Sequence, residues 1–352
     1  MPAYFARPGR PRTSGRLARS PQLAAELAAR LTARDRWLLR MLHEHRVLTT
    51  SQVTQLAFGT GRAATARMTT LYQYRAVDRF RPLAPAGSSP LHFILDEAGA
   101  MLLAAEDGIT PEGLGYRRDR SMAIALSPRL AHYVGANGIF TALAAAARAS
   151  GGAQALECWW GERRCAAAWG ESARPDGYGR WSEQSPGQPP ATADFFLEYD
   201  TGTEPLTRVI AKLAGYAALA ARTGITTPVL FWLPNPRREA ALHARLAGPP
   251  PPGTRDAASA AQIPGVPVAT AAPGTSPDGP AGAAWLPAAS PGPRLRLAQL
   301  APPGTAAPDG GSPAEETEGG PPGGLAWHPP EPAPPAWNAL PGEPRPDGDG
   351  DD

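Results

Sequence analysis

The chain has 352 residues and a formal net charge of +2, which divides into +8 over residues 1–120, +2 over 121–248 and −8 over 249–352. Its two cysteines, Cys158 and Cys165, form neither a zinc motif nor a disulfide framework, so we expect reduced thiols in a cytoplasmic protein. No apolar run reaches the roughly 18 residues of a membrane span, and the arginine-rich start lacks the apolar core of a secretory signal. Composition therefore argues against membrane, exported and disulfide-stapled proteins.

The first third of the chain reads as a series of helices. Residues 1–20 are basic and predicted to be disordered, and leucines spaced four apart predict a helix over 21–31. Residues 34–45 place their apolar side chains on one face, and Thr49 begins a short helix that ends near residue 58. The next predicted helix covers 62–75 and is the third when counted from residue 34.

A hairpin follows these helices. Residues 77–80 and 91–95 read as two short strands around a tip rich in proline, glycine and serine, and a further helix covers 97–105. Helices followed by a hairpin are typical of a winged helix-turn-helix, in which the third helix enters the major groove. Residues 21–120 are therefore predicted to form a winged-helix DNA-binding domain.

The charge of this region favours double-stranded DNA as its partner. No acid occurs from Gly59 through Val77, and arginines lie on the third helix and beside the hairpin. The predicted DNA-binding residues are Arg62, Arg67, Arg75, Arg79 and Arg81. A protein-docking module is the alternative that the pattern leaves open.

The middle of the chain, residues 121–247, predicts a small α/β sandwich. A helix over 127–149 starts at Ser127-Pro128 and ends at two glycines. The other predicted elements are strands at 156–160, 165–169, 178–181, 194–199 and 228–233, with a helix over 204–222 before the last strand.

Three acids and a lysine carry the candidate chemistry of this sandwich. Asp176 lies in an Arg-Pro-Asp-Gly turn, Glu198 and Asp200 end a predicted strand, and Lys212 is the single lysine of the chain. An acid in a turn, an acid at a strand end and a lysine close behind are typical of a metal-dependent phosphodiesterase. The alternative is that Asp176 and Asp200 only form turns and helix caps.

The motifs RPDG, FFLEYDTGTE and KLAGY, with the predicted winged helix ahead of them, resemble the replication-relaxation family of plasmid and mobile-element proteins. The resemblance covers residues 30–235. The central region also looks like the PD-(D/E)xK restriction-endonuclease-like superfamily, and the family is linked to mobilisation relaxases that use such a fold. The implied fold class is α+β, with a winged helix, a PD-(D/E)xK-like sandwich and a disordered tail.

The resemblance also implies roles for individual residues. Asp176 matches the first acid of the motif and Glu198 the second, and in that superfamily both bind a divalent cation, usually Mg²⁺. Asp200 stands where the motif lysine should fall, so Lys212 is the candidate to supply the ammonium from a migrated position. The predicted catalytic residues are Lys212, Glu198 and Asp176, and the predicted Mg²⁺ ligands are Asp176, Glu198 and Asp200. His132 and Glu157 are secondary candidates.

The last part of the chain, residues 248–352, holds 26 of the 43 prolines and is predicted to be a disordered, acidic tail. The alternating stretches around Trp285 and Leu295 are its candidates for docking back on the core. The sequence thus predicts a DNA-binding replication or mobilisation protein of a plasmid or integrative element, with other replication or conjugation proteins as further candidate partners. It leaves three forms open: a Mg²⁺-dependent nicking enzyme, a non-catalytic accessory factor and a winged-helix transcriptional regulator.

Overall fold

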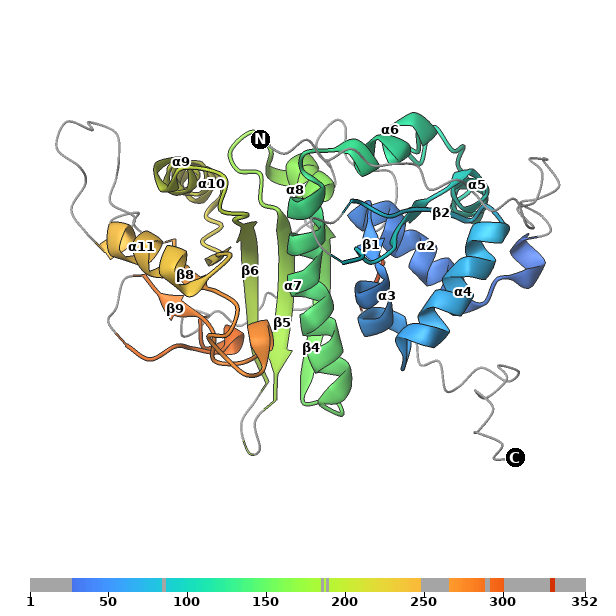
Figure 1. Ribbon diagram of the computed structural model, residues 1–352. Coiled ribbons are helices and arrows are strands. Elements are labelled where there is room, and N and C mark those ends of the chain that lie inside the picture. Colours follow the sequence, from blue (N-terminus) through green and yellow to red (C-terminus); the bar gives the residue numbers. More distant parts are fainter. Residues whose placement is uncertain are drawn as a thin grey trace, which may run out of the picture.

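The computed structural model describes residues 27–83, 87–184, 187, 190–247, 266–288, 292–300 and 330–332. These residues form a mixed α and β protein with two sheets, one three-stranded and one six-stranded. We call residues 27–106 the head and residues 130–300 the body (Figure 1). The predicted disordered start, residues 1–20, lies outside the described residues, as does most of the first predicted helix.

In the head, the predicted helices and the two predicted strands follow one another in the expected order, and a short strand, β1, adds to them. Its elements are α2 (Ala33–His45), β1 (Leu48–Thr49), α3 (Thr50–Ala57), α4 (Gly61–Gln73), β2 (Val77–Phe80), β3 (His92–Leu95) and α5 (Glu97–Glu106). The strands are antiparallel and lie in the order β1-β3-β2. Thr32, Thr49 and Thr60 begin α2, α3 and α4, and each accepts a hydrogen bond from a backbone N–H of the first turn.

A short connection, α6 (Arg118–Ala123) and η1 (Ile124–Leu126), leads from the head to the body. The body begins with α7 (Leu130–Ala149), β4 (Gln154–Gly161), α8 (Glu162–Trp169), β5 (Gly177–Glu183) and β6 (Ala191–Tyr199). It continues with α9 (Leu206–Ala211), α10 (Leu213–Thr223), β7 (Val229–Trp232) and α11 (Pro236–Ala247). The last elements are β8 (Val268–Ala271), η3 (Gly279–Ala281), β9 (Leu286–Pro287) and η4 (Leu297–Gln299).

The large sheet has the order β4-β5-β6-β7-β8-β9. Strands β4, β5 and β6 are antiparallel neighbours, whereas β7 runs parallel to β6 and β8 runs parallel to β7. Side chains alternate between the two faces of the sheet. Phe195 and Leu197 belong to the hydrophobic cluster that includes α7 and the head, and Phe196 belongs to the cluster that includes α8, α10 and α11. The body is therefore three layers, with helices on both faces of the sheet.

One predicted strand is wrong. Residues 165–169 lie in α8, in which Cys165 and Trp169 are buried four residues apart. Gly161 ends β4 and precedes the helix, and Glu162 places a negative charge in its first turn. A five-residue apolar run is too short to distinguish the 3.6-residue period of a helix from the two-residue period of a strand. The prediction therefore assigned a strand where the structure has an eight-residue helix.

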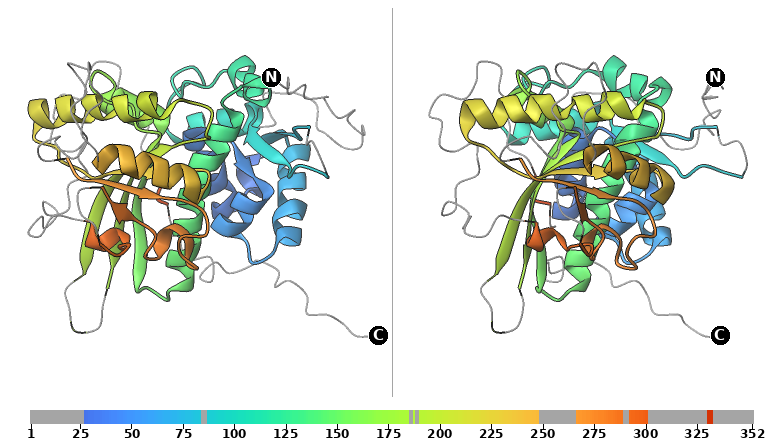
Figure 2. Two further views of the ribbon diagram at one scale, coloured as in Figure 1. Left: turned by 60° about the vertical axis from the view of Figure 1, so that its left-hand side comes forward. Right: turned by 90° about the vertical axis from the view of Figure 1, so that its left-hand side faces the viewer.

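The predicted start of the disordered tail at residue 248 is also wrong for part of the chain. Strands β8 and β9 extend the sheet at the edge beside α11 (Figure 2), and Trp285 is fully buried in the large hydrophobic cluster. The backbones of Trp285 and Leu295 pair with each other, so the candidate docking stretches do join the core. The remainder of the predicted tail lies outside the described residues, apart from residues 330–332.

Helix α7 is the one helix in the described part of the chain that is long and apolar enough to cross a membrane. Length and composition alone give this result, and the core helix of a water-soluble protein meets the same criterion. Phe140 and Leu143 of α7 are buried in the cluster shared with the sheet and the head.

Candidate functional site

The candidate site lies where β5 begins and β6 ends. The two strands pair with Gly177 opposite Leu197, and the backbone N–H of Asp176 donates to the Leu197 carbonyl at 2.9 Å. Asp176 and Glu198 are therefore brought to the same end of neighbouring strands, 22 positions apart in the sequence. The register therefore places two of the predicted site residues at one end of the sheet.

Both oxygens of Asp176 accept hydrogen bonds from the protein. His132 Nε2 lies 2.7 Å from Oδ1, and the backbone N–H of Tyr199 donates to Oδ2 at 2.8 Å. Burial lowers the pKa of His132, but the hydrogen bond and charge of Asp176 outweigh it and raise the pKa above its ordinary value. His132 comes from α7, and the sequence named it only as a secondary candidate.

A glycine in α7 makes this arrangement possible. A Cβ atom at Gly135 would lie 2.1 Å from the Tyr199 ring, a distance that no side chain tolerates. Because Gly135 lets the ring lie against α7, the end of β6 approaches the helix turn that carries His132. The rings of His132 and Tyr199 meet edge to face, with centroids 5.9 Å apart.

Glu198 is buried and also accepts two hydrogen bonds. Lys212 Nζ donates to Oε2 at 2.6 Å, and the Tyr216 hydroxyl donates to Oε1 at 2.6 Å. Burial and the charge of Asp176 raise the pKa of Glu198 to about 7, although Lys212 and Tyr216 act in the opposite direction. A carboxyl group with this pKa changes its protonation near neutral pH, which is typical of functional sites but also occurs in structural networks.

Lys212 lies at the junction of α9 and α10, where the single predicted helix over 204–222 divides. Burial lowers the pKa of Lys212, but the nearby charges of Glu198 and Asp176 outweigh it and raise the pKa above its ordinary value. Lys212 is therefore positively charged at neutral pH. Glu198 contacts Lys212 and Tyr216, Asp176 contacts His132, and the charge of Asp176 acts on both Glu198 and Lys212. We call these five residues the acid cluster.

Asp200 does not join this cluster. Its carboxylate forms an ion pair with Arg238 of α11 and also accepts the backbone N–H of Gly202 at 2.7 Å. The prediction that Asp200 shares a metal ion with Asp176 and Glu198 therefore fails, because Asp200 turns toward a cation that follows it by 38 positions. Glu157, the other secondary candidate, is exposed on β4 beside an irregularity in its pairing with β5.

The remaining side chains do not fit a Mg²⁺ site of the predicted kind. Asp200 faces Arg238, which leaves two of the three predicted carboxylate ligands, and the Lys212 ammonium directly contacts Glu198. Within the described ranges, no group of three or more histidine, cysteine, aspartate or glutamate side chains could hold a metal ion. Mg²⁺ stays a prediction from the family resemblance.

The predicted DNA-binding arginines of the head have different environments. Arg62 is exposed on α4, and Arg81 is exposed beside the hairpin, where it donates to Ser88 Oγ at 2.7 Å. Arg79 stacks on the Tyr72 ring, with its guanidinium carbon 4.3 Å from the centroid, and is half-buried. Arg75, half-buried after α4, has a left-handed backbone with φ of 59°.

Arg67 has a structural partner. Its guanidinium Nε donates to Asp35 Oδ1 at 2.8 Å, and a second nitrogen contacts Oδ2 of the same carboxylate. Asp35 is fully buried and also closes the first turn of α2 with Thr32. Arg67 therefore neutralises a buried carboxylate. The sequence pattern did not indicate this pair, because Asp35 lies 32 residues earlier in the chain.

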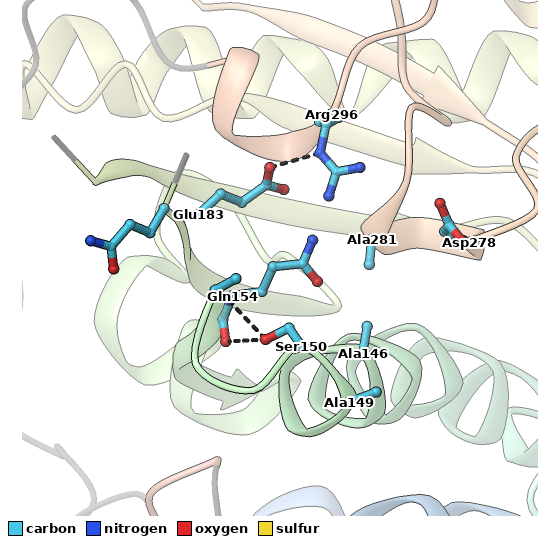
Figure 3. A pocket seen from close by; sticks show the side chains of 10 residues that line it. Ala146, Ala149, Ser150, Gln154, Glu183, Asp278, Ala281 and Arg296 are labelled. Atoms are coloured by element: carbon cyan, nitrogen blue, oxygen red, sulfur yellow. Dashed lines mark hydrogen bonds and ion pairs between the residues drawn. The ribbon is translucent and has the colours of Figure 1, made fainter. Parts of the chain in front are cut away.

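A cavity of about 560 Å³ lies at the other end of α7, away from the acid cluster (Figure 3). Alanines of α7 and η3 line it together with the ion pair between Glu183 and Arg296, whose atoms are 2.7 Å apart. Ala146 of this cavity follows His132 by 14 residues of α7, or about 21 Å at 1.5 Å per residue. The cavity and the acid cluster are therefore separate features of the body.

The sequence matches the family described as replication-relaxation over residues 39–230, which is more than half of the chain. The chain belongs to the replication-relaxation family. The matched region contains most of the head, α7, and the strands that carry Asp176 and Glu198, so membership indicates a function connected with replication or mobilisation. No curated protein and no solved structure gives a significant match to this replication-relaxation protein.

Proposed function

We propose that this replication-relaxation protein binds duplex DNA through its head, as a non-catalytic replication or mobilisation factor of a plasmid or integrative element acting in the cytoplasm. The observation that carries the proposal is the exposed, acid-free surface of α4, which carries Arg62 and follows α2 and α3 in a helix-turn-helix order. The small sheet of order β1-β3-β2, with β2 and β3 as the hairpin, supports the winged-helix form of this head.

In this arrangement α4 would enter the major groove and the hairpin would contact the backbone. Arg62 lies in the first turn of α4, where recognition helices approach base edges, and Thr65 and Ala66 are exposed on the same helix. Arg81 and Ser88 belong to the hairpin and suit phosphate contacts. Arg67 is left out of this surface because it neutralises Asp35.

The body supports the non-catalytic form of the proposal. The order α7, β4, β5, β6, α9–α10, β7, with antiparallel strands followed by a parallel one, is consistent with a PD-(D/E)xK-like sandwich. In this body, however, Asp200 occupies the position of the motif lysine and pairs with Arg238. The carboxylates of Asp176 and Glu198 are closed by internal donors, so we infer that the network holds the strand ends and α10 together.

Fluorescence anisotropy of a labelled duplex, measured over a salt series, tests the proposal. We expect the Arg62→Ala, Arg81→Ala double variant to bind more weakly, with a log–log salt slope smaller by about 1 for each arginine that contacts phosphate. Arg237→Ala, Arg245→Ala is the matched control, because both arginines are exposed on α11 of the body. Wild-type protein that fails to bind duplex at low salt would contradict DNA binding by the head.

A cleavage assay separates the two forms of the function. Supercoiled plasmid that carries the origin of the host element is incubated with the protein and MgCl₂, and we expect no nicking. Nicking that is lost in Asp176→Asn and retained in the α11 control would contradict the non-catalytic form and restore the nuclease hypothesis.

A further inference from the structure

A cavity of about 120 Å³ lies where the head meets the body. It is enclosed by the C-terminal end of α2, the segment from Gly115 through η1, and α8, and Leu95 at the end of β3 forms part of its wall. Four arginines line it: Arg46, Arg117, Arg120 and Arg163. These residues come from three separate stretches of sequence, so only the docking of the head on the body assembles them.

No carboxylate lines this cavity. Within the described chain, Arg46 and Arg120 have no acidic partner, whereas Arg117 pairs with the exposed Asp119 at 3.2 Å. Arg163 donates to the backbone carbonyl of His43 at 2.8 Å. The cavity is therefore positively charged.

Of the acids around this lining, Asp78 and Asp96 pair with Arg118, which does not line the cavity, and their charges also act on Tyr116. Glu44, the nearest acid of α2, accepts the Gly161 N–H at 2.9 Å and pairs with Arg164. Burial lowers the pKa of Arg163, and the charges of Arg46 and Arg164 lower it further, while Glu44 acts in the opposite direction. Mutual repulsion of these cations favours an anion between them.

Neutral donors complete the lining. The Tyr116 hydroxyl is buried and has no hydrogen-bond partner among the described residues, and Ser121 also faces this cavity. Burial and the charges of Asp96, Glu97 and Asp78 raise the pKa of Tyr116 well above its ordinary value, so its hydroxyl keeps its proton and can donate. A buried hydroxyl without a partner is uncommon in folded proteins and points to a missing ligand or water.

We propose that this cavity binds a phosphate group, and that in the DNA complex it receives a backbone phosphate; this second part rests on the proposed function. Guanidinium groups match the oxygens of phosphate with paired hydrogen bonds, and a tyrosine hydroxyl adds a neutral donor. A volume of about 120 Å³ holds a phosphate group but not the base attached to it.

The location of this cavity suits a DNA strand that passes from the head toward the body. Arg46 and Arg163 also line a smaller cavity of about 20 Å³ that includes His132 and Asp176. A phosphate bound between the four arginines would therefore lie next to the acid cluster. Leu95 ends the strand that leads from the hairpin, about 10 Å from His92 at 3.3 Å per residue.

The test uses the full-length double variant Arg46→Gln, Arg120→Gln. Glutamine keeps a Cβ at Arg46, whose backbone is already left-handed with φ of 69°, so the substitution removes charge without a change in backbone strain. Arg237→Gln, Arg245→Gln on α11 is the matched control with the same loss of charge. Arg120→Gln alone, on the exposed face of α6, is the second variant if Arg46→Gln lowers the melting temperature.

Two measurements separate the sources of the phosphate. The first is the salt slope of duplex binding by anisotropy, which we expect to fall by about 2 in the variant and to stay unchanged in the control. The second is the melting temperature in inorganic phosphate against chloride at equal ionic strength, which we expect to rise for the wild type and not for the variant.

These measurements distinguish failure of the phosphate-site proposal from failure of the proposed DNA-binding function. An unchanged DNA slope with a phosphate-dependent melting temperature would retain the site but overturn the backbone phosphate as its ligand. If the Arg62→Ala, Arg81→Ala variant loses DNA binding while this variant changes neither measurement, the cavity proposal is overturned and DNA binding by the head stands. If wild-type protein binds no DNA, the phosphate measurement alone decides the site.

Discussion

Buried carboxylates in this protein are compensated in two ways. Asp35 and Asp200 each form an ion pair with an arginine. Removal of one partner from such a buried pair strongly destabilises the folded protein. Glu198 instead accepts hydrogen bonds from the Lys212 ammonium and the Tyr216 hydroxyl. Burial and the charge of Asp176 raise the pKa of Glu198 to about 7. The stability contributed by Glu198 therefore depends on pH in a range where the cell operates.

Glu198→Gln should reduce the pH dependence of stability. The pKa of Glu198 rises from 4.5 to about 7 on folding, so its contribution is complete below pH 4.5 and is lost as the pH rises through about 7. At about 1.4 kcal/mol per pKa unit, the wild type should lose up to roughly 3 kcal/mol of unfolding free energy from this group. Urea unfolding at pH 5 and pH 8.5 measures the difference.

Glu157→Gln, an exposed substitution on β4, is the control for this measurement. His132 contributes in the same direction, because its pKa is also raised, so a smaller decline is expected to persist in Glu198→Gln. An equal decline in the wild type and in Glu198→Gln would show that Glu198 does not titrate in this range.

At the scale of elements, the C-terminal strands complete a sheet that the matched region leaves open. Strand β8 pairs with β7, and Thr270 of β8 donates to Glu239 of α11 at 3.1 Å. Arg294 forms an ion pair with the same carboxylate, which is buried, at 2.7 Å. Without these segments, β7 would become an edge strand and Glu239 would be a buried charge without its cation.

A chain ending at Ala247 should therefore lose stability. One ending at Leu300 should lose less, because among the described residues beyond it only 330–332 contact the head, where Trp37 Nε1 donates to the Glu331 carbonyl at 2.7 Å. The shorter chain loses Trp285, and removal of one buried aromatic side chain typically costs about 3–5 kcal/mol. Thermal unfolding of both chains checks this expectation, and Trp285→Ala in the full-length protein replaces the shorter chain if that chain is insoluble. Equal melting temperatures for all these proteins would show that β8 and β9 add nothing to the core.

At the scale of the whole molecule, the head and the body share one hydrophobic cluster. The His45 ring stacks on Trp159 of β4 with centroids 3.6 Å apart, and burial keeps the pKa of His45 far below its ordinary value, so the ring is neutral. Asn137 of α7 donates to the carbonyls of His45 and Val47 at 3.1 and 2.8 Å. These contacts fix the head on the body.

The described part of the protein should consequently unfold in a single cooperative transition. Asn137→Ala removes the side-chain donor of the Val47 carbonyl, whereas the His45 carbonyl still accepts the backbone N–H of Val47 at 2.8 Å. We expect a loss of about 1–3 kcal/mol that moves the entire transition. Calorimetry together with near-UV and far-UV circular dichroism measures this. Two separated transitions, with only the first one shifted by Asn137→Ala, would show that the head folds independently.

Local sequence patterns determined much of the secondary structure of this protein and part of its candidate site. The order of helices and strands in the head, the strands around Asp176 and Glu198, and the pairing of Glu198 with Lys212 all follow from periodicity, turn residues and short motifs. These signals act over a few residues, so they can be read without the fold.

The tertiary structure decided the features that depend on partners distant in sequence. Arg67 became a counterion for Asp35, Asp200 turned to Arg238, and α8 formed where an apolar run also suited a strand. Strands β8 and β9 joined the sheet although the composition around them resembles a disordered tail. In each case the deciding energy is a buried charge pair or buried apolar surface that exists only once distant segments meet, which no local pattern records.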